Sequence, residues 1–487
     1  MRKPSFFWHD YETFGIDSRR DRPSQFAGIR TTLDLEPIGD PVSFYCKLAP
    51  DVLPRPMSCL ITGLTPQKVE RDGVSEAEFA SRVHDELSQP GTCGVGYNSI
   101  RFDDEFTRNL LYRNFFDPYE REWKDGNSRW DIIDLARMSY ALRPEGIVWP
   151  TRDDGLPSFK LEDLSAANGL AHAHAHDALS DVYATLELAR LLKRSQPKLW
   201  DFYFSLRQKQ HALELLDWAH LTPVLHISSR YATDRGCVAM VVPLTVHPDQ
   251  QNKVIVYDLD VDPTPLIELD AEEIADRVFT SRDALPDDVA RIPLKAVSIN
   301  KSPALAPMSV LRETDAKRVN LDRERGERHL AQLRAATKVA EKCRRVFATL
   351  RGNQERVDPE LGIYSGFACD ADRKLFQKVR STAPDNLGNS DFGLKDWRCE
   401  DLLFRYRARN HPHTLTRTEH DRWDQFRRTR LTQSTPLSTI TLDEFFGEIA
   451  AARLDPANAG SRTVVLDQIE EWGRALAREL ATEPVTS

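Results

Sequence analysis

Apolar residues follow two different spacings in the first part of the chain. Short apolar runs predict buried strands at 6–8, 42–46 and 92–98, and helical spacing predicts helices at 76–89, 103–116, 131–141 and 176–194. Strands that alternate with helices in this way are typical of an α/β domain.

The pattern changes near 195–197. From about 221 to 301, prolines and aspartates separate short apolar runs, which lie at 224–227, 238–242, 254–257 and 296–299. This spacing predicts a small antiparallel β domain. Charged helical patterns resume at about 324. We therefore expect an α/β domain at 1–195, a β domain with a helical extension at 197–350, and a mostly helical domain at 353–482.

Composition narrows the class of protein. Of 487 residues, 40% are hydrophobic, which excludes a disordered or fibrous chain. No window approaches the roughly 18 apolar residues of a membrane span, and the N-terminus turns acidic too soon for a signal peptide, so we expect a soluble cytoplasmic protein.

The seven cysteines form no C-x-x-C pair, which argues against a disulfide framework or a cysteine zinc site. We expect them to be reduced core thiols.

The formal charge of −9 argues against a protein that coats nucleic acid non-specifically, although a local basic groove remains open. Residues 398–430 hold nine arginines interleaved with aromatic residues. Arginines mixed with aromatic rings suit a strand of bases and phosphates. The alternative interpretation is a solvated helix face whose aromatic rings point into the core.

Acidic residues follow the expected strands and open the expected helices. Asp10 and Glu12 lie at the end of the first strand, where a D-x-E spacing directs both carboxylates to one face. Such a pair repels unless a cation lies between them, and hard oxygen ligands suit Mg²⁺ or Mn²⁺. Asp103 and Asp104 open a helix, so one of them can cap it while the other faces a cleft.

The third acidic element combines a histidine with a carboxylate. His176 precedes a helix whose first turns contain Asp181. Three carboxylates can hold two metal ions for phosphoryl chemistry, and a histidine can take the proton of a water. The rival interpretation is a zinc-binding tract formed by His172, His174 and His176.

In this order, the acidic elements resemble the DEDDh exonuclease superfamily. The strings FFWHDYETFG, GYNSIRFDDEFTRN, DDGLPSFKLEDL and HDALSDVYAT are similar to those of the bacterial exodeoxyribonuclease I family, and the similarity extends over nearly the whole chain. The resemblance implies an RNase H-like exonuclease domain, a small SH3-like β-barrel domain and a helical C-terminal domain. It also implies a monomeric enzyme that removes 5′-mononucleotides processively from the 3′ end of single-stranded DNA, in repair and recombination.

The resemblance assigns roles to individual residues. Asp10, Glu12 and Asp181 would be ligands of two Mg²⁺ ions, with Mn²⁺ as an alternative, Asp103 the fourth acidic residue and His176 the general base. Glu12 would also contact the substrate. The residues that match DNA-contacting positions of the family are Arg108, Tyr119, Trp123, Arg137 and Lys160. Lys160 replaces an arginine, which keeps the charge but loses the bidentate fork.

Family members also dock the acidic C-terminal tail of the single-stranded DNA-binding protein. Arg143, Phe202 and Arg312 match that docking surface, whereas Thr222 and Pro307 depart from it. Two other functions stay open: an RNA exonuclease similar to ribonuclease T, and a module that binds single-stranded DNA without cleaving it. The ribonuclease T group consists of short chains, and all five pattern residues are present here, which favours the DNA exonuclease.

Overall fold

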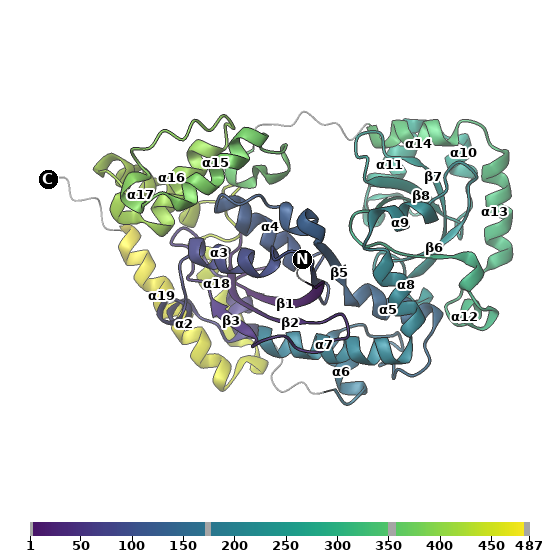
Figure 1. Cartoon of the computed structure of the whole chain (residues 1–487), viewed down its shortest axis with the longest axis horizontal. Helices are drawn as coiled ribbons and strands as arrows, with labels where there is room; N and C mark the ends of the chain where they lie inside the picture. Colours follow the sequence, from purple (N-terminus) through teal and green to yellow (C-terminus); the bar gives the residue numbers. More distant parts are fainter. Residues whose placement is uncertain (1–2, 171–176, 349–356, 482–487) are drawn as a thin grey trace. The chain divides into compact units, whose positions relative to one another are not determined.

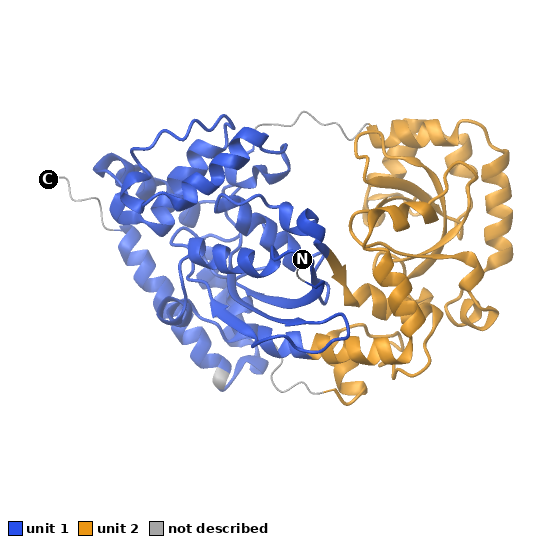
Figure 2. Cartoon of the chain, viewed as in Figure 1, with its two compact units in different colours: residues 1–128, 173–183, 356–487 blue, residues 129–172, 184–355 orange. Residues whose placement is uncertain are grey.

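The computed structural model describes residues 3–170, 177–348 and 357–481 (Figure 1). The chain divides into two compact units (Figure 2): residues 1–128, 173–183 and 356–487 form unit 1, and residues 129–172 and 184–355 form unit 2. The C-terminal segment thus shares a unit with the N-terminal one. The three domain limits expected from the sequence remain a prediction.

The N-terminal sheet is built around β1 (Ser5–Thr13), in the strand order β3-β2-β1-β4-β5. β1 pairs antiparallel with β2 and parallel with β4, and β2 pairs antiparallel with β3. The other strands are β2 (Pro23–Thr31), β3 (Val42–Tyr45), β4 (Thr92–Gly96) and β5 (Ser128–Asp131). The apolar runs predicted β1, β3 and β4 but missed β2 and β5.

Two helices, α3 (Glu76–Leu87) and α4 (Asp103–Arg113), cover one face of this sheet. Phe7, Tyr11 and Phe26 share a core cluster with Phe79 of α3 and Leu110 of α4. Because side chains alternate along a strand, the residues on either side of Tyr11 point to the opposite face. The apolar core on one face therefore fixes the direction of two acidic residues on the other.

Gly96 brings the end of β4 close to β1. A Cβ atom at this position would lie 2.7 Å from the Ser99 Cβ and 2.9 Å from the His9 carbonyl oxygen, so no larger residue fits without a shift. Asn98 follows with a φ of 64°, in the left-handed region that asparagine tolerates. This tight turn places Asp103, the first residue of α4, beside β1.

Unit 2 contains a second five-stranded sheet in the order β10-β6-β7-β8-β9, with antiparallel pairs throughout. Its strands are β6 (Val224–Ile227), β7 (Val238–Val246), β8 (Lys253–Asp258), β9 (Leu294–Ser298) and β10 (Ala304–Pro307). The four apolar runs correspond to the first four strands, and β10 was missed.

The remaining helices are distributed over the two units (Figure 2). They are α1 (Pro56–Thr62), α2 (Pro66–Asp72), α5 (Ile132–Leu142), α6 (Leu161–Ala167), α7 (Ala178–Ser195), α8 (Pro197–Ser205), α9 (Lys209–Leu215), α10 (Thr264–Glu268), α11 (Ala271–Phe279), α12 (Glu313–Arg318), α13 (Arg323–Ala335), α14 (Val339–Ala348), α15 (Asp370–Ser381), α16 (Cys399–Asn410), α17 (Arg417–Thr432), α18 (Leu442–Leu454) and α19 (Ser461–Ala481). Short 3₁₀ helices include η1 (Glu120–Glu122) and η6 (Pro359–Tyr364). Cys59 of α1 packs with Phe445 of α18 and Ile469 of α19, so the C-terminal helices share a core with the N-terminal segment.

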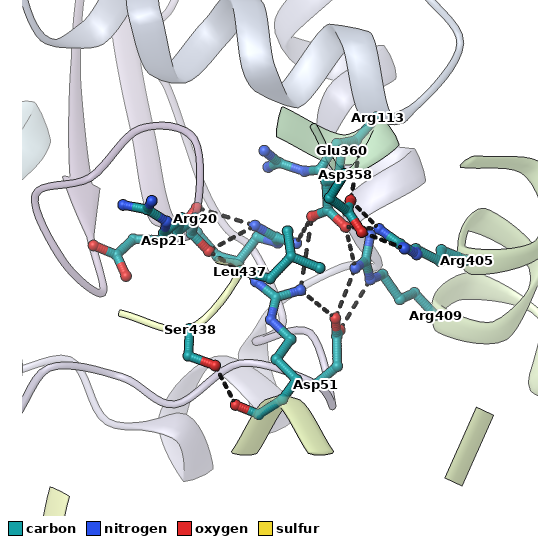
Figure 3. Close-up of polar contacts among 12 residues, drawn as sticks. Arg20, Asp21, Asp51, Arg113, Asp358, Glu360, Arg405, Arg409, Leu437 and Ser438 are labelled. Atoms are coloured by element: carbon teal, nitrogen blue, oxygen red, sulfur yellow. Dashed lines mark hydrogen bonds and ion pairs between the residues drawn. The ribbon is translucent and has the colours of Figure 1, made fainter. Parts of the chain in front are cut away.

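Three arginines of residues 398–430, namely Arg405, Arg409 and Arg430, form a buried ion-pair network within unit 1 (Figure 3). Arg409 donates two hydrogen bonds to Asp51, at 2.9 and 2.7 Å, and one to Glu360 at 2.7 Å. Arg405 forms a bidentate pair with Asp358, at 2.7 and 2.8 Å, and Arg407, outside this network, pairs with Glu419. For these four arginines both interpretations are wrong, because they lie neither on a solvated face nor free for a nucleic acid strand. Arg417 and Arg422, by contrast, are exposed, as the solvated-face interpretation expected. Three of the interleaved aromatic rings are buried, as the second interpretation expected, namely Phe404, Tyr406 and Trp423.

The cysteines are free and mostly buried, and the described helices are short or polar. All seven cysteines are free of disulfide bonds, and six of them are buried. Cys369 is exposed and caps α15, where its Sγ accepts the backbone N–H of Asp372 at 3.5 Å. Among the described residues, every helix is too short or too polar to cross a bilayer.

Candidate active site

β1 presents Asp10 and Glu12 on the face opposite to α3 and α4. Asp10 lies opposite Ala27 of β2 and Glu12 lies opposite Gln25, both within regular antiparallel pairing. Between them, Tyr11 points into the core, where its hydroxyl shares a 3.0 Å hydrogen bond with Thr107 of α4. The alternation predicted from the D-x-E spacing is thus the geometry that the sheet adopts.

The two aspartates that open α4 point to different partners. Asp103 accepts the backbone N–H of Tyr11 at 3.1 Å, which places its carboxylate beside β1 and close to Asp10. Asp104 instead forms a buried ion pair with Arg121, at 2.5 Å. Of the neighbouring pair, Asp103 therefore belongs to the carboxylate group on β1, as the sequence motif suggested.

Helix α7 supplies the next carboxylate. Asp181, in its first turn, has a carboxylate oxygen that lies within 4.8 Å of carboxylate oxygens of both Asp10 and Glu12. Asp177 lies just before the helix, accepts the Ser180 backbone N–H at 3.2 Å, and accepts a hydrogen bond from Gln25 at 3.1 Å. Sequence reasoning missed Asp177 as a neighbour of the site, although its position at a helix N-terminus was a usable signal.

The carboxylates raise one another's pKa. Burial, together with the charges of Asp103, Glu12, Asp181 and Asp177, holds the pKa of Asp10 well above its usual range. Burial, with the charges of Asp181 and Asp177, raises the pKa of Glu12 to about 8. The group is therefore electrostatically unfavourable when its members are ionised and no cation lies between them.

These residues fit a divalent metal. Carboxylate oxygens are hard donors, which suit Mg²⁺ and Mn²⁺, and three of them converge from two separate elements. The raised pKa values of Asp10 and Glu12 supply the second argument, because a bound dication relieves the repulsion that raises them. The acidic group is thus a candidate metal centre.

We expect the metal-free protein to lose stability as the pH rises from about 5 to about 8. The pKa of Glu12 is about 8 in the folded chain, against an ordinary value of 4.5, so the folded state binds more protons than the unfolded state in this range. Its contribution is fully present below about pH 4.5 and is lost as the pH passes the folded pKa. Mg²⁺ should offset this loss, so it should raise the melting temperature more at pH 8 than at pH 6. Thermal unfolding with Mg²⁺ or EDTA checks this, and an equal shift at both pH values would contradict it.

The expected general base, His176, lies outside the described residues, as do His172 and His174 of the rival zinc tract. Among the residues that the structure describes, the acidic group above is the one that gathers three metal-binding side chains.

The residues expected to contact a strand differ in their surroundings. In unit 1, Trp123 is 61% exposed beside η1, whereas Tyr119 is half-buried with its ring 5.4 Å from that of Phe367. They flank a 3₁₀ helix and do not share the packed helix face that was the alternative interpretation. Arg108 is buried and paired with Glu105 and Glu122.

The other two expected strand contacts lie in unit 2. Lys160 is exposed just before α6. Arg137 of α5 is 8% exposed, donates to Asp134 at 2.8 Å and lies over the ring of Phe159. Arg137 is therefore not the exposed surface arginine that the alternative interpretation described.

The expected docking residues also lie in unit 2. Arg143 and Phe202 line a largely apolar hollow of about 430 Å³, together with Leu142, Pro197, Lys198, Leu199 and Val310. Arg312 does not line the hollow but lies beside it: its guanidinium pairs with Asp315 at 2.5 Å and Glu145 at 2.6 Å, and donates to the Leu142 carbonyl at 3.4 Å. Asp315 also lies 3.9 Å from Arg143. The structure therefore brings the three expected docking residues to one region of unit 2, two of them in the lining of the hollow and Arg312 beside it.

Comparison with known proteins places each part of the chain. Family models described as an exonuclease, an exonuclease I SH3-like domain and an exonuclease I C-terminal domain match residues 7–189, 207–349 and 357–476. This order confirms the predicted fold class: an exonuclease domain, an SH3-like β domain and a helical C-terminal domain.

Individual relatives match over nearly the full length. Exodeoxyribonuclease I of Escherichia coli is 46% identical over 427 residues, which is 88% of this chain and 90% of that protein. The exonuclease I structure from Methylocaldum szegediense has a TM-score of 0.93 at 50% identity and covers 97% of this chain and 99% of its own. The E. coli exonuclease I structure in complex with a dA16 oligonucleotide has a TM-score of 0.93 at 43% identity, and covers 97% of this chain and 100% of its own. The chain therefore belongs to the exodeoxyribonuclease I family.

Proposed function

We propose that this chain is a divalent-metal-dependent exonuclease that removes nucleotides from the 3′ end of single-stranded DNA. The observation that carries the proposal is the convergence of Asp10, Glu12 and Asp181 within 4.8 Å, in a chain of this family. A relative with the same fold binds a dA16 oligonucleotide.

Five residues of the chain have separate roles in the proposed reaction. Asp10, Glu12 and Asp181 would hold two Mg²⁺ ions, or Mn²⁺ in their place, and Asp103 lies beside β1 through its hydrogen bond from the Tyr11 N–H. Bound divalent ions would polarise the phosphate and stabilise the leaving 3′ oxygen. His176 takes the proton of the attacking water, and Glu12 also contacts the terminal nucleotide.

A direct assay tests the reaction. The protein is incubated with 5′-labelled single-stranded DNA, with Mg²⁺ or EDTA, beside a strand blocked by a 3′-phosphate, a blunt duplex and a matched RNA strand. We expect Mg²⁺-dependent shortening of the free DNA strand from its 3′ end. Faster shortening of RNA would favour the ribonuclease T-like alternative, and a retained gel shift without shortening would favour a binding module.

We propose that Trp123 stacks on an unpaired base of the strand, with Tyr119, Arg108, Arg137 and Lys160 as further contacts. Its indole is 61% exposed, and base stacking on an aromatic ring contributes about 1–3 kcal/mol. Trp123→Ala should therefore weaken binding of a 12-nucleotide strand about ten-fold in EDTA, measured by fluorescence anisotropy. The matched control is Trp397→Ala, at a second exposed tryptophan, and equal losses in both variants would contradict the assignment.

We also propose that the hollow around Arg143 and Phe202 binds the acidic C-terminal tail of the single-stranded DNA-binding protein. A solved structure of SSB and exonuclease I with an inhibitor, 42% identical to this chain, supports that partner. The lining combines the basic residues Arg143 and Lys198 with apolar residues, which suits a peptide with acidic residues and an apolar end. We place the protein in the cytoplasm as a monomer.

Arg143→Ala should weaken binding of an acidic tail peptide about ten-fold, because it removes the guanidinium beside the hollow. Isothermal titration with the peptide measures the effect. The control is Lys317→Ala, at an exposed lysine of α12 that does not line the hollow, and a loss of the same size there would show a general charge effect instead.

A further inference from the structure

Arg108 of α4 is enclosed by two carboxylates. Its Nε and Nη2 donate to the two carboxylate oxygens of Glu122, at 2.7 and 2.9 Å, and its Nη1 donates to Glu105 at 2.7 Å. The side chains of Arg108 and Glu122 are only 6% and 9% exposed. Every nitrogen that a phosphate could approach is therefore already engaged, in the bidentate manner that a phosphate would use.

The neighbouring Arg121 offers a second place for the same carboxylate. Its Nη2 pairs with Asp104 at 2.5 Å and lies 4.0 Å from Oε1 of Glu122. Its Nε is buried and has no hydrogen-bond partner among the described residues. Glu122 thus lies between two guanidinium groups, bonded fully to one, while the other keeps an unused donor.

Glu105 and Glu122 differ in how firmly they are held. Glu105 lies one turn from Arg108 on the same helix and also accepts the hydroxyl of Tyr364. Glu122 belongs to the three-residue η1, between Tyr119 and Trp123, the residues proposed to contact the strand. Of the two carboxylates, Glu122 is the one placed to change partners.

We propose that Glu122 is an internal competitor of the DNA strand for Arg108. A backbone phosphate takes the place of the Glu122 carboxylate on Arg108, and Glu122 moves to Arg121. This rests on the proposed function, because it requires a strand to lie along η1. Glu122 then sets the affinity for the strand, since each binding event must first displace a bidentate ion pair.

The test measures binding of a fluorescent single-stranded DNA in EDTA by anisotropy, for the full-length protein. Glu122→Gln weakens the internal pair with little change in shape, so the strand should bind on the order of ten-fold more tightly. Glu120→Gln is the matched control, because it removes the same charge from the same 3₁₀ helix at a residue paired with the exposed Lys124. The gain at position 122 should vanish in an Arg108→Met background, where no guanidinium is left to be released.

Arg121→Met should have the opposite effect and weaken binding, because the displaced carboxylate loses its second partner. Melting temperatures of all variants separate a folding defect from an affinity change. Glu122→Gln that binds no more tightly than Glu120→Gln, or that keeps its gain without Arg108, would overturn the exchange. Wild-type protein that shortens the same DNA in a parallel reaction with Mg²⁺ shows that such a failure concerns Glu122 and not the proposed function.

Discussion

Asp10→Asn should lower the rate of single-stranded DNA hydrolysis by about 10³-fold or more. Loss of a metal ligand removes several kcal/mol of transition-state stabilisation, and each 1.36 kcal/mol corresponds to a factor of ten. Strand binding should survive, because the proposed contacts lie on other elements. Single-turnover cleavage and anisotropy measure the two properties separately.

The same substitution should act on stability in the opposite direction. Burial and four neighbouring carboxylates raise the pKa of Asp10 well above its usual range, so its ionised form destabilises the metal-free protein. Asp10→Asn should leave the melting temperature in EDTA unchanged or higher at pH 8, and should reduce the stabilisation by Mg²⁺. Asp85→Asn, at an exposed position of α3, is the control for both assays. Undiminished cleavage by the Asp10 variant would exclude the metal-ligand assignment.

Local patterns were sufficient to predict much of the site. The D-x-E spacing placed Asp10 and Glu12 on one face because a strand alternates its side chains, and this holds wherever the strand is regular. The choice between Asp103 and Asp104 depended on the motif, since both open the same helix. What separates them is the tertiary position of Arg121, 17 residues away, which no helix periodicity reveals.

Strand β2 shows where the pattern fails. It begins with a proline and carries Ser24 and Gln25, so it lacks the apolar run that identifies a buried strand, yet eight of its nine residues are buried. The side-chain amide of Gln25 donates hydrogen bonds to Ser43 and to Asp177, and Asp177 is far away in the sequence. A polar residue can occupy a core strand when such partners exist, but the partners become visible only in three dimensions.

The prediction for the arginines of α16 and α17 was wrong for the same reason. The density of arginines and aromatic rings suggested a strand of bases and phosphates, but Arg409 and Arg430 bind Asp51 of the chain itself, and Arg409 also binds Glu360. Asp51 is 358 residues from Arg409, and no sequence window joins them. Arginine-rich segments therefore predict a need for anions more reliably than they identify which anions those are.

Glu360→Gln should destabilise the protein by about 3–5 kcal/mol, because it leaves buried guanidinium groups without their shared anion. Glu360 is fully buried. It contacts Arg409 at 2.7 Å and Arg405 at 3.3 Å (Figure 3), and it also pairs with Arg22. Burial opposes its ionisation, but Arg409, Arg22, Arg430 and Arg405 outweigh burial and hold the pKa of Glu360 well below its usual range. Urea unfolding at pH 7 measures the loss.

Two measurements compare the buried arginine network with an ordinary surface ion pair: the pH dependence of the loss in Glu360→Gln, and the loss in a variant of a surface pair. A carboxyl with a lowered pKa contributes stability that is present above its unfolded pKa, near 4.5, and is lost as the pH falls toward the folded value. The difference between wild type and Glu360→Gln should therefore shrink below about pH 4.5. Glu448→Gln removes a half-exposed pair with Arg55, which also joins the N- and C-terminal segments, and should cost less than about 1 kcal/mol. If both variants lost the same free energy of unfolding, the buried arginine network would contribute no more than a surface contact to holding the C-terminal helices in unit 1.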